Sequence, residues 1–92
     1  MSHRTLTRVE YTVIFDYTTT DWITHPYIHV TMKTDTVNTW VTSLIPIQGW
    51  ARESEVARRC IVERFSVEWD QLSVDDCVVA SNTTTVKLHA NF

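Results

Sequence analysis

Four histidines are the residues of this 92-residue sequence best suited to holding a metal ion. They are His3, His25, His29 and His89. On a helix, the four-residue spacing between His25 and His29 would bring two imidazoles together. The spacing falls in a segment with a strand pattern, however, where four residues span about 13 Å and one ion cannot bridge both rings. We therefore expect neither a metal site nor a cofactor.

The two cysteines are the candidate nucleophiles. Cys60 lies beside Arg58 and Arg59, whose charges favour a thiolate. A helical wheel nevertheless places Cys60 toward the packed side, and no motif fixes a histidine near it. Two cysteines are too few for the disulfide framework of a small secreted domain, so Cys60 and Cys77 are predicted to be buried, reduced thiols. With one glycine, Gly49, the sequence also lacks phosphate-cradling loops, and we expect no enzyme.

The charge pattern disfavours direct nucleic-acid binding. The formal charge is −3 at pH 7, which leaves little for phosphate neutralisation. Arginines between residues 52 and 64 are interleaved with glutamates, as on a solvated, salt-bridged helix face. The sequence begins without an apolar secretory region and has no window long enough to cross a membrane, so a cytoplasmic protein is expected.

Carboxylates and aromatic rings near predicted turns form the candidate partner-binding set. The acidic residues lack the glycine-containing loop of a calcium site, but they could complement a basic partner. The aromatic residues stand beside predicted turns or a proline, where burial is often incomplete, and Trp and Tyr commonly anchor protein interfaces. The alternative is that the rings pack over the end of the sheet. The candidate residues are Trp22, Tyr27, Trp50, Glu68, Asp70, Asp75 and Asp76.

These residues must be positioned by long strands, because the chain has 15 Thr and 12 Val. Residues 5–17 alternate apolar and polar side chains, which predicts a half-buried strand. Residues 22–33 predict a second strand whose regular pairing begins near Tyr27, since Pro26 cannot donate a ladder hydrogen bond. Residues 76–80 and 84–89 predict a terminal hairpin.

Two segments are less clearly patterned. Residues 35–45 fit helical spacing, but their Thr, Val and Trp content favours a strand, and we prefer the strand. Residues 51–64 are dominated by helix-forming residues and predict the main helix. Its apolar face would hold Ala57, Ile61 and Phe65. The alternation at residues 65–69 indicates that the helix gives way to a strand.

The sequence thus predicts a single domain over residues 1–92 in the α+β class. A small antiparallel sheet of four or five strands carries one main helix, about 51–64, on one face, with a nearly all-β fold as the alternative.

We expect a non-enzymatic protein-binding module that docks on a larger macromolecular complex. A small acidic domain without a catalytic site suits a phage or mobile-element inhibitor of a host defence complex, similar in role to an anti-CRISPR protein. The alternatives are a self-assembling subunit, as a homo-oligomer or virion-type assembly, and a small ligand-binding domain or enzyme.

Overall fold

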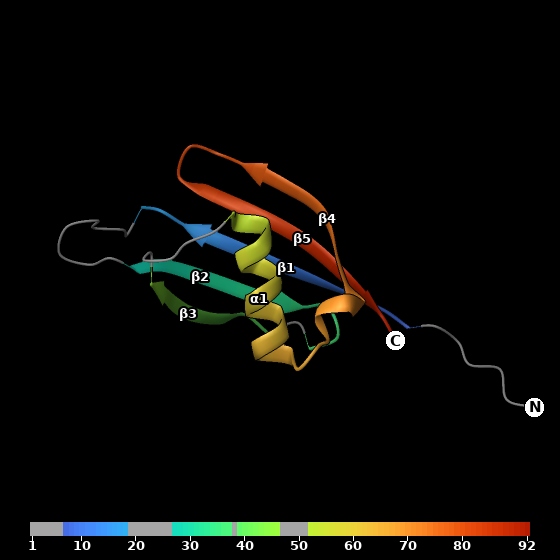
Figure 1. Ribbon diagram of the computed structural model, residues 1–92. Helices are drawn as coiled ribbons and strands as arrows, with labels where there is room; N and C mark the ends of the chain where they lie inside the picture. Colours follow the sequence, from blue (N-terminus) through green and yellow to red (C-terminus); the bar gives the residue numbers. More distant parts are fainter. Residues whose placement is uncertain (1–6, 19–26, 38, 47–51) are drawn as a thin grey trace, which may run out of the picture.

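The computed structural model describes residues 7–18, 27–37, 39–46 and 52–92. They form a five-stranded antiparallel sheet in the order β3-β2-β1-β5-β4, with one helix across one face (Figure 1). The α+β prediction is confirmed. The elements are β1 (Arg8–Asp16), β2 (Tyr27–Thr34), β3 (Val41–Pro46), α1 (Glu53–Phe65), the 3₁₀ turn η1 (Trp69–Gln71), β4 (Leu72–Val79) and β5 (Thr83–Asn91).

β1 is the centre of the sheet because its alternating side chains suit a strand covered on one face. Val9, Tyr11, Val13 and Phe15 are buried, and the residues between them are not. β1 pairs antiparallel with β2 on one side and with β5 on the other. β2 begins at Tyr27, where the sequence predicted regular pairing to begin.

α1 completes the core by laying its apolar side on the sheet. Val56, Ala57, Cys60 and Ile61 are buried there, in contact with the buried side chains of β1, β2 and β5. The ring of Phe65 packs on Tyr11 with centroids 5.4 Å apart. The helix packs mainly on β1, β4 and β5. Edge strand β3 is consequently less well covered, and its side chains are half-buried or exposed.

The chain leaves α1 through Ser66, which has the left-handed conformation that usually favours glycine (φ 56°, ψ 40°). A sequence with one glycine must place another residue there. The strand predicted from the alternation at residues 65–69 is wrong. Phe65 ends the helix, Val67 is buried in the core between the helix and η1, and Trp69 begins η1.

The third strand and the two cysteines follow the sequence predictions only in part. Within residues 35–45 the strand prediction holds for β3, which starts at Val41 after a turn at residues 35–37. The prediction that both cysteines are buried is wrong for Cys77, because β4 lies at the sheet edge and leaves this thiol exposed. Both thiols are free. No helix in the described residues is long and apolar enough to cross a membrane.

Candidate functional site

Four of the seven candidate residues lie on one continuous segment at the edge of the sheet. Glu68 and Asp70 belong to the cap and first turn of η1, and Asp75 and Asp76 belong to β4, which follows η1 directly. All four side chains are exposed. We call residues 68–79 the acidic edge. Between Arg64 and Lys87 the sequence has four carboxylates and no lysine or arginine, so the charges of this segment itself are all negative. Two arginines approach it from other elements, Arg8 at Asp75 and Arg58 at Trp69.

The acidic edge also exposes apolar side chains. Val78 and Val79 are 53% and 71% exposed, and Val74 is also exposed. From Ser73 onward every residue of β4 is exposed, which makes this strand unlike the others in the sheet. β4 pairs only with β5 among the described residues, and it contains neither proline nor glycine. Its outer backbone groups therefore remain available for pairing with another strand.

Asp75 lies at an irregularity in β4, and its carboxylate contacts side chains of the strands β5 and β1. The register with β5 shifts between Val74 and Asp76, so Asp75 is the extra residue of a β-bulge. Nδ1 of His89 donates to Asp75, with 2.7 and 2.8 Å to the two carboxylate oxygens. The Arg8 guanidinium approaches the same carboxylate at 3.4 Å. These contacts hold the edge strand to β5 and β1.

The other carboxylates contribute less to the fold. Glu68 caps η1 through its backbone: its carbonyl oxygen accepts from the Gln71 N–H at 3.0 Å, and its N–H donates to Gln71 Oε1 at 3.2 Å. Asp76 accepts from the backbone N–H of Cys77 at 2.9 Å. Asp70 makes no hydrogen bond or ion pair to a described residue. A hollow of about 360 Å³ adjoins the edge and is lined by the side chains of Glu10, Asp75 and Asp76 and of two cations, Arg8 and Lys87, among others.

Trp69 is a surface aromatic residue that sequence reasoning missed, because it was assigned to a strand. The residue is 37% exposed, and its ring lies under the Arg58 guanidinium, 4.1 Å from the ring centroid. Arg58 also donates to the carbonyl oxygens of Trp69 at 2.8 Å and Leu72 at 3.3 Å. The spacing of 11 residues between Arg58 and Trp69 gives no periodic signal from which this contact could be found.

Tyr27 is separated from the acidic edge. It is 46% exposed at the start of β2 and pairs with Pro46, whereas β1 and β5 lie between β2 and β4. Trp22 and Trp50, the remaining candidates, lie outside the described residues. The structure therefore brings the acidic candidates together and leaves Tyr27 on the other half of the sheet.

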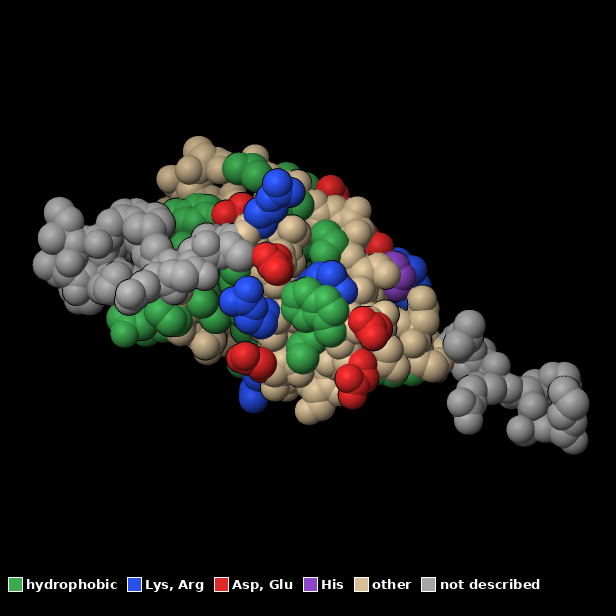
Figure 2. Space-filling model, in the orientation of Figure 1, with side chains coloured by type: hydrophobic (Ala, Val, Ile, Leu, Met, Phe, Trp, Pro, Cys, Tyr) green, Lys and Arg blue, Asp and Glu red, His purple; other side chains and the backbone are tan. Residues whose placement is uncertain are grey.

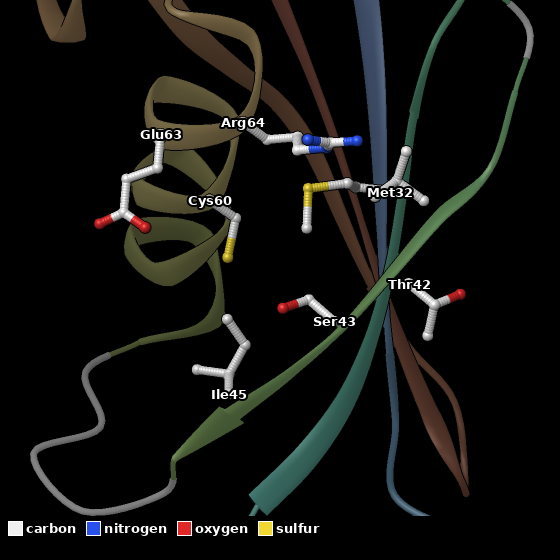
Figure 3. A pocket seen from close by; sticks show the side chains of 8 residues that line it. Met32, Thr42, Ser43, Ile45, Cys60, Glu63 and Arg64 are labelled. Carbon is white, nitrogen blue, oxygen red and sulfur yellow. The ribbon is translucent and has the colours of Figure 1, made fainter.

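A second hollow, of about 400 Å³, lies between α1 and β3 (Figure 3). Met32, Val41, Ile45 and Cys60 give it apolar walls. Its polar lining residues are Thr42, Ser43, Glu63 and Arg64. In Figure 3 the Cys60 thiol and the Ser43 hydroxyl point into the space between the helix and the strand. We call this hollow the β3–α1 groove.

The Cys60 thiol is not activated as a nucleophile. Burial, together with the nearby Glu63 carboxylate, raises its pKa to about 11, and Arg59 opposes them only in part. The thiol is therefore protonated at neutral pH. Among the described residues no three His, Cys, Asp or Glu side chains are placed to hold one metal ion.

Charges of both signs alternate over the face that carries α1, around a few exposed apolar side chains (Figure 2). This mixed pattern agrees with the solvated helix face predicted from the sequence. The predicted salt bridges are not observed, because the described residues of α1 form no ion pair with one another. The chain matches no protein-family model, no curated protein and no solved structure.

Proposed function

We propose that this chain is a non-enzymatic protein-binding module that docks on a basic, extended segment of a larger protein through its acidic edge. The observation that carries the proposal is β4 itself, an edge strand with exposed valines and carboxylates and with an unpaired outer side among the described residues. A partner strand added to such an edge gains main-chain hydrogen bonds, and the neighbouring side chains give it specificity.

The charge of the edge selects the partner. Four carboxylates with no intervening cation attract a segment that carries Lys or Arg, and they repel an acidic one. The hollow beside Asp75 and Asp76 has three carboxylates against two cations, which favours entry of a basic side chain. Trp69 offers a ring at the start of the same edge, and aromatic residues are frequent anchors of interfaces.

Self-association through the same edge is the competing role, as a homo-oligomer or structural subunit. An antiparallel pair of β4 strands would bury exposed valines from both copies. It would also bring the Asp75 and Asp76 carboxylates of both copies to one seam, where like charges destabilise the pairing. The acidic edge therefore favours a basic partner over a second copy.

The test is an affinity capture from host lysate with two matched variants. D70K/V78K changes one carboxylate and one exposed valine of the acidic edge to lysine. E55K/V37K makes the same two changes at exposed positions of α1 and the β2–β3 turn. Both variants have the same net charge, and all four positions are exposed, so both should fold.

We expect one stoichiometric partner that survives nuclease treatment and binds through a basic segment. Its affinity should fall at least tenfold with D70K/V78K, remain unchanged with E55K/V37K, and weaken as salt concentration rises. Equal losses with both variants, or a partner released by nuclease, would contradict the proposal. Light scattering that finds a stable homo-oligomer, lost only with D70K/V78K, would assign the edge to self-association.

The setting expected from the sequence, a phage or mobile-element inhibitor of a host defence complex, stays a prediction. It is tested by adding the purified protein to such a complex and measuring its activity. If the protein neither bound the defence complex nor changed its activity, that setting would be excluded. The acidic edge would then have to bind a different partner.

A further inference from the structure

The β3–α1 groove lies on the opposite half of the sheet from the acidic edge and is independent of the proposed docking function. It arises because α1 packs mainly on β1, β4 and β5 and leaves the helix-facing side of β3 partly open. The result is a hollow of about 400 Å³, which is within the range of small-molecule sites in proteins.

Apolar and polar side chains share the lining of the groove, and none of them is an aromatic ring. Met32 and Cys60 are buried at its back, and Val41 and Ile45 are half-buried on the strand side. Unbranched thioether and aliphatic side chains adapt to a flexible chain more readily than to a rigid ring. At roughly 30 Å³ for each water-sized atom, the volume corresponds to about 13 non-hydrogen atoms.

A cation stands at the mouth of the groove. Arg64, in the last turn of α1, extends from the helix toward the strands, whereas Glu63 extends away from them (Figure 3). Arg64 makes no ion pair with a described carboxylate. A guanidinium beside an apolar hollow complements an apolar anion, and it binds a carboxylate in a bidentate manner.

The Ser43 hydroxyl gives the groove a second polar group. It points into the groove and makes no hydrogen bond to a described residue. The neutral Cys60 thiol places no charge against an incoming anion. The carboxylate of Glu63 is the opposing charge, and its direction away from the strands leaves Arg64 as the charged group that faces the mouth.

We propose that the β3–α1 groove binds a medium-chain aliphatic carboxylic acid, with its chain against Met32, Ile45 and Cys60 and its carboxylate on Arg64. An alcohol of the same chain length offers the guanidinium one neutral acceptor oxygen in place of a charged pair of oxygens, so we expect the site to bind the acid more tightly than the alcohol. In this proposal the groove takes the fatty acid from solution as a single molecule, and not from the surface of a lipid bilayer.

The test is calorimetric titration with sodium decanoate below its micelle concentration, with 1-decanol as the neutral comparison. Charge-assisted hydrogen bonds are among the stronger polar contacts, so R64Q should bind decanoate at least tenfold more weakly. R59Q is the matched control, because Arg59 is exposed on the same helix and does not line the groove. S43L, which fills the groove, should abolish binding.

The proposal holds if decanoate binds the native chain at least tenfold more tightly than decanol and R59Q binds as the native chain does. Amide shifts on titration should concentrate at residues 41–45 and 60–64. It is overturned if decanoate does not bind, if R64Q and R59Q behave alike, or if the chain binds only phosphatidylglycerol vesicles. None of these outcomes changes the partner capture by the acidic edge, so the two proposals fail separately.

Discussion

The two thiols of this chain differ because of their place in the sheet and helix rather than because of their sequence neighbours. Cys60 is beside two arginines, yet burial against the sheet raises its pKa to about 11. Cys77 is on the exposed edge strand, and its pKa is raised by partial burial and by the Glu53 and Asp76 carboxylates. The buried environment of Cys60 therefore disfavours the thiolate that the neighbouring arginines would favour.

The raised pKa of Cys60 predicts a loss of stability at alkaline pH. The folded state favours the neutral thiol, so its contribution is fully present below the ordinary pKa of 9.0 and is lost as pH rises toward about 11. Burial also raises the pKa of Tyr11 and Tyr17, which act in the same direction. We expect the free energy of unfolding to fall on the order of 2 kcal/mol through Cys60 across this range.

Urea unfolding at pH 7, 9 and 10.5 measures this effect. The C60A variant should show a smaller decline between pH 9 and 10.5 than the native chain, whatever its stability at pH 7. A C77A variant is the comparison: the exposed Cys77 has the smaller pKa shift, so its removal should change the decline less than C60A does. If the free energy of unfolding of the native chain and of C60A declined equally with pH, the alkaline loss of stability would not come from Cys60.

At the scale of elements, Arg58 connects α1 to the junction between η1 and β4. Its guanidinium spans the Trp69 and Leu72 carbonyls while stacking on the Trp69 ring. One side chain of the helix therefore supports the turn that begins the acidic edge. Both hydrogen bonds come from one nitrogen, Nη2, while the plane of the guanidinium lies over the ring. An ammonium group can donate to a carbonyl, but it has no plane that stacks on the ring.

We predict that R58K lowers the free energy of unfolding by about 1–2 kcal/mol through the lost hydrogen bonds and stacking. R59K, at the exposed neighbouring position, should change it by less than about 0.5 kcal/mol. Urea unfolding measures both values. Hydrogen exchange should also become faster at residues 69–72 in R58K alone, and equal behaviour of the two variants would contradict this role.

For the whole molecule, one core joins the helix to the sheet. The chain crosses from edge strand β3 over the sheet to the other edge strand β4, and α1 is the crossover. Ile61 is fully buried at the centre of that contact, together with Val13, Phe15 and Leu88. A domain of this size buries a modest share of its surface, so few such residues hold it together.

I61A is therefore expected to lower the free energy of unfolding by about 2–5 kcal/mol. This is a large part of the roughly 5–15 kcal/mol by which a whole domain is typically stable. V37A, at a position 64% exposed, should be nearly neutral. Thermal and urea unfolding measure both. If I61A changes the free energy of unfolding only slightly, the packing of α1 on the sheet contributes little to stability. The helix side of the β3–α1 groove would then not be held in place by this contact.

Much of the fold could be predicted from local pattern. The alternation in residues 9–15 specified β1, Pro26 indicated where β2 begins, and helix-forming residues specified α1 within two residues of its observed ends. The alternation at Phe65, Val67 and Trp69 misled, because the first ends a helix and the last begins a 3₁₀ turn. A period of two over five residues is too short to separate these cases.

The sequence by itself determined the β-rich character, the helix, the acidic balance and the clustering of carboxylates in residues 68–76. Only the tertiary structure decided that β4 is an edge, that Tyr27 lies away from those carboxylates, and that Cys77 is exposed. Strand order and helix placement depend on contacts between residues distant in sequence, such as Arg58 with Trp69 and Asp75 with His89. Local periodicity carries no information on such contacts, so the acidic edge and the β3–α1 groove emerge only when the chain is folded.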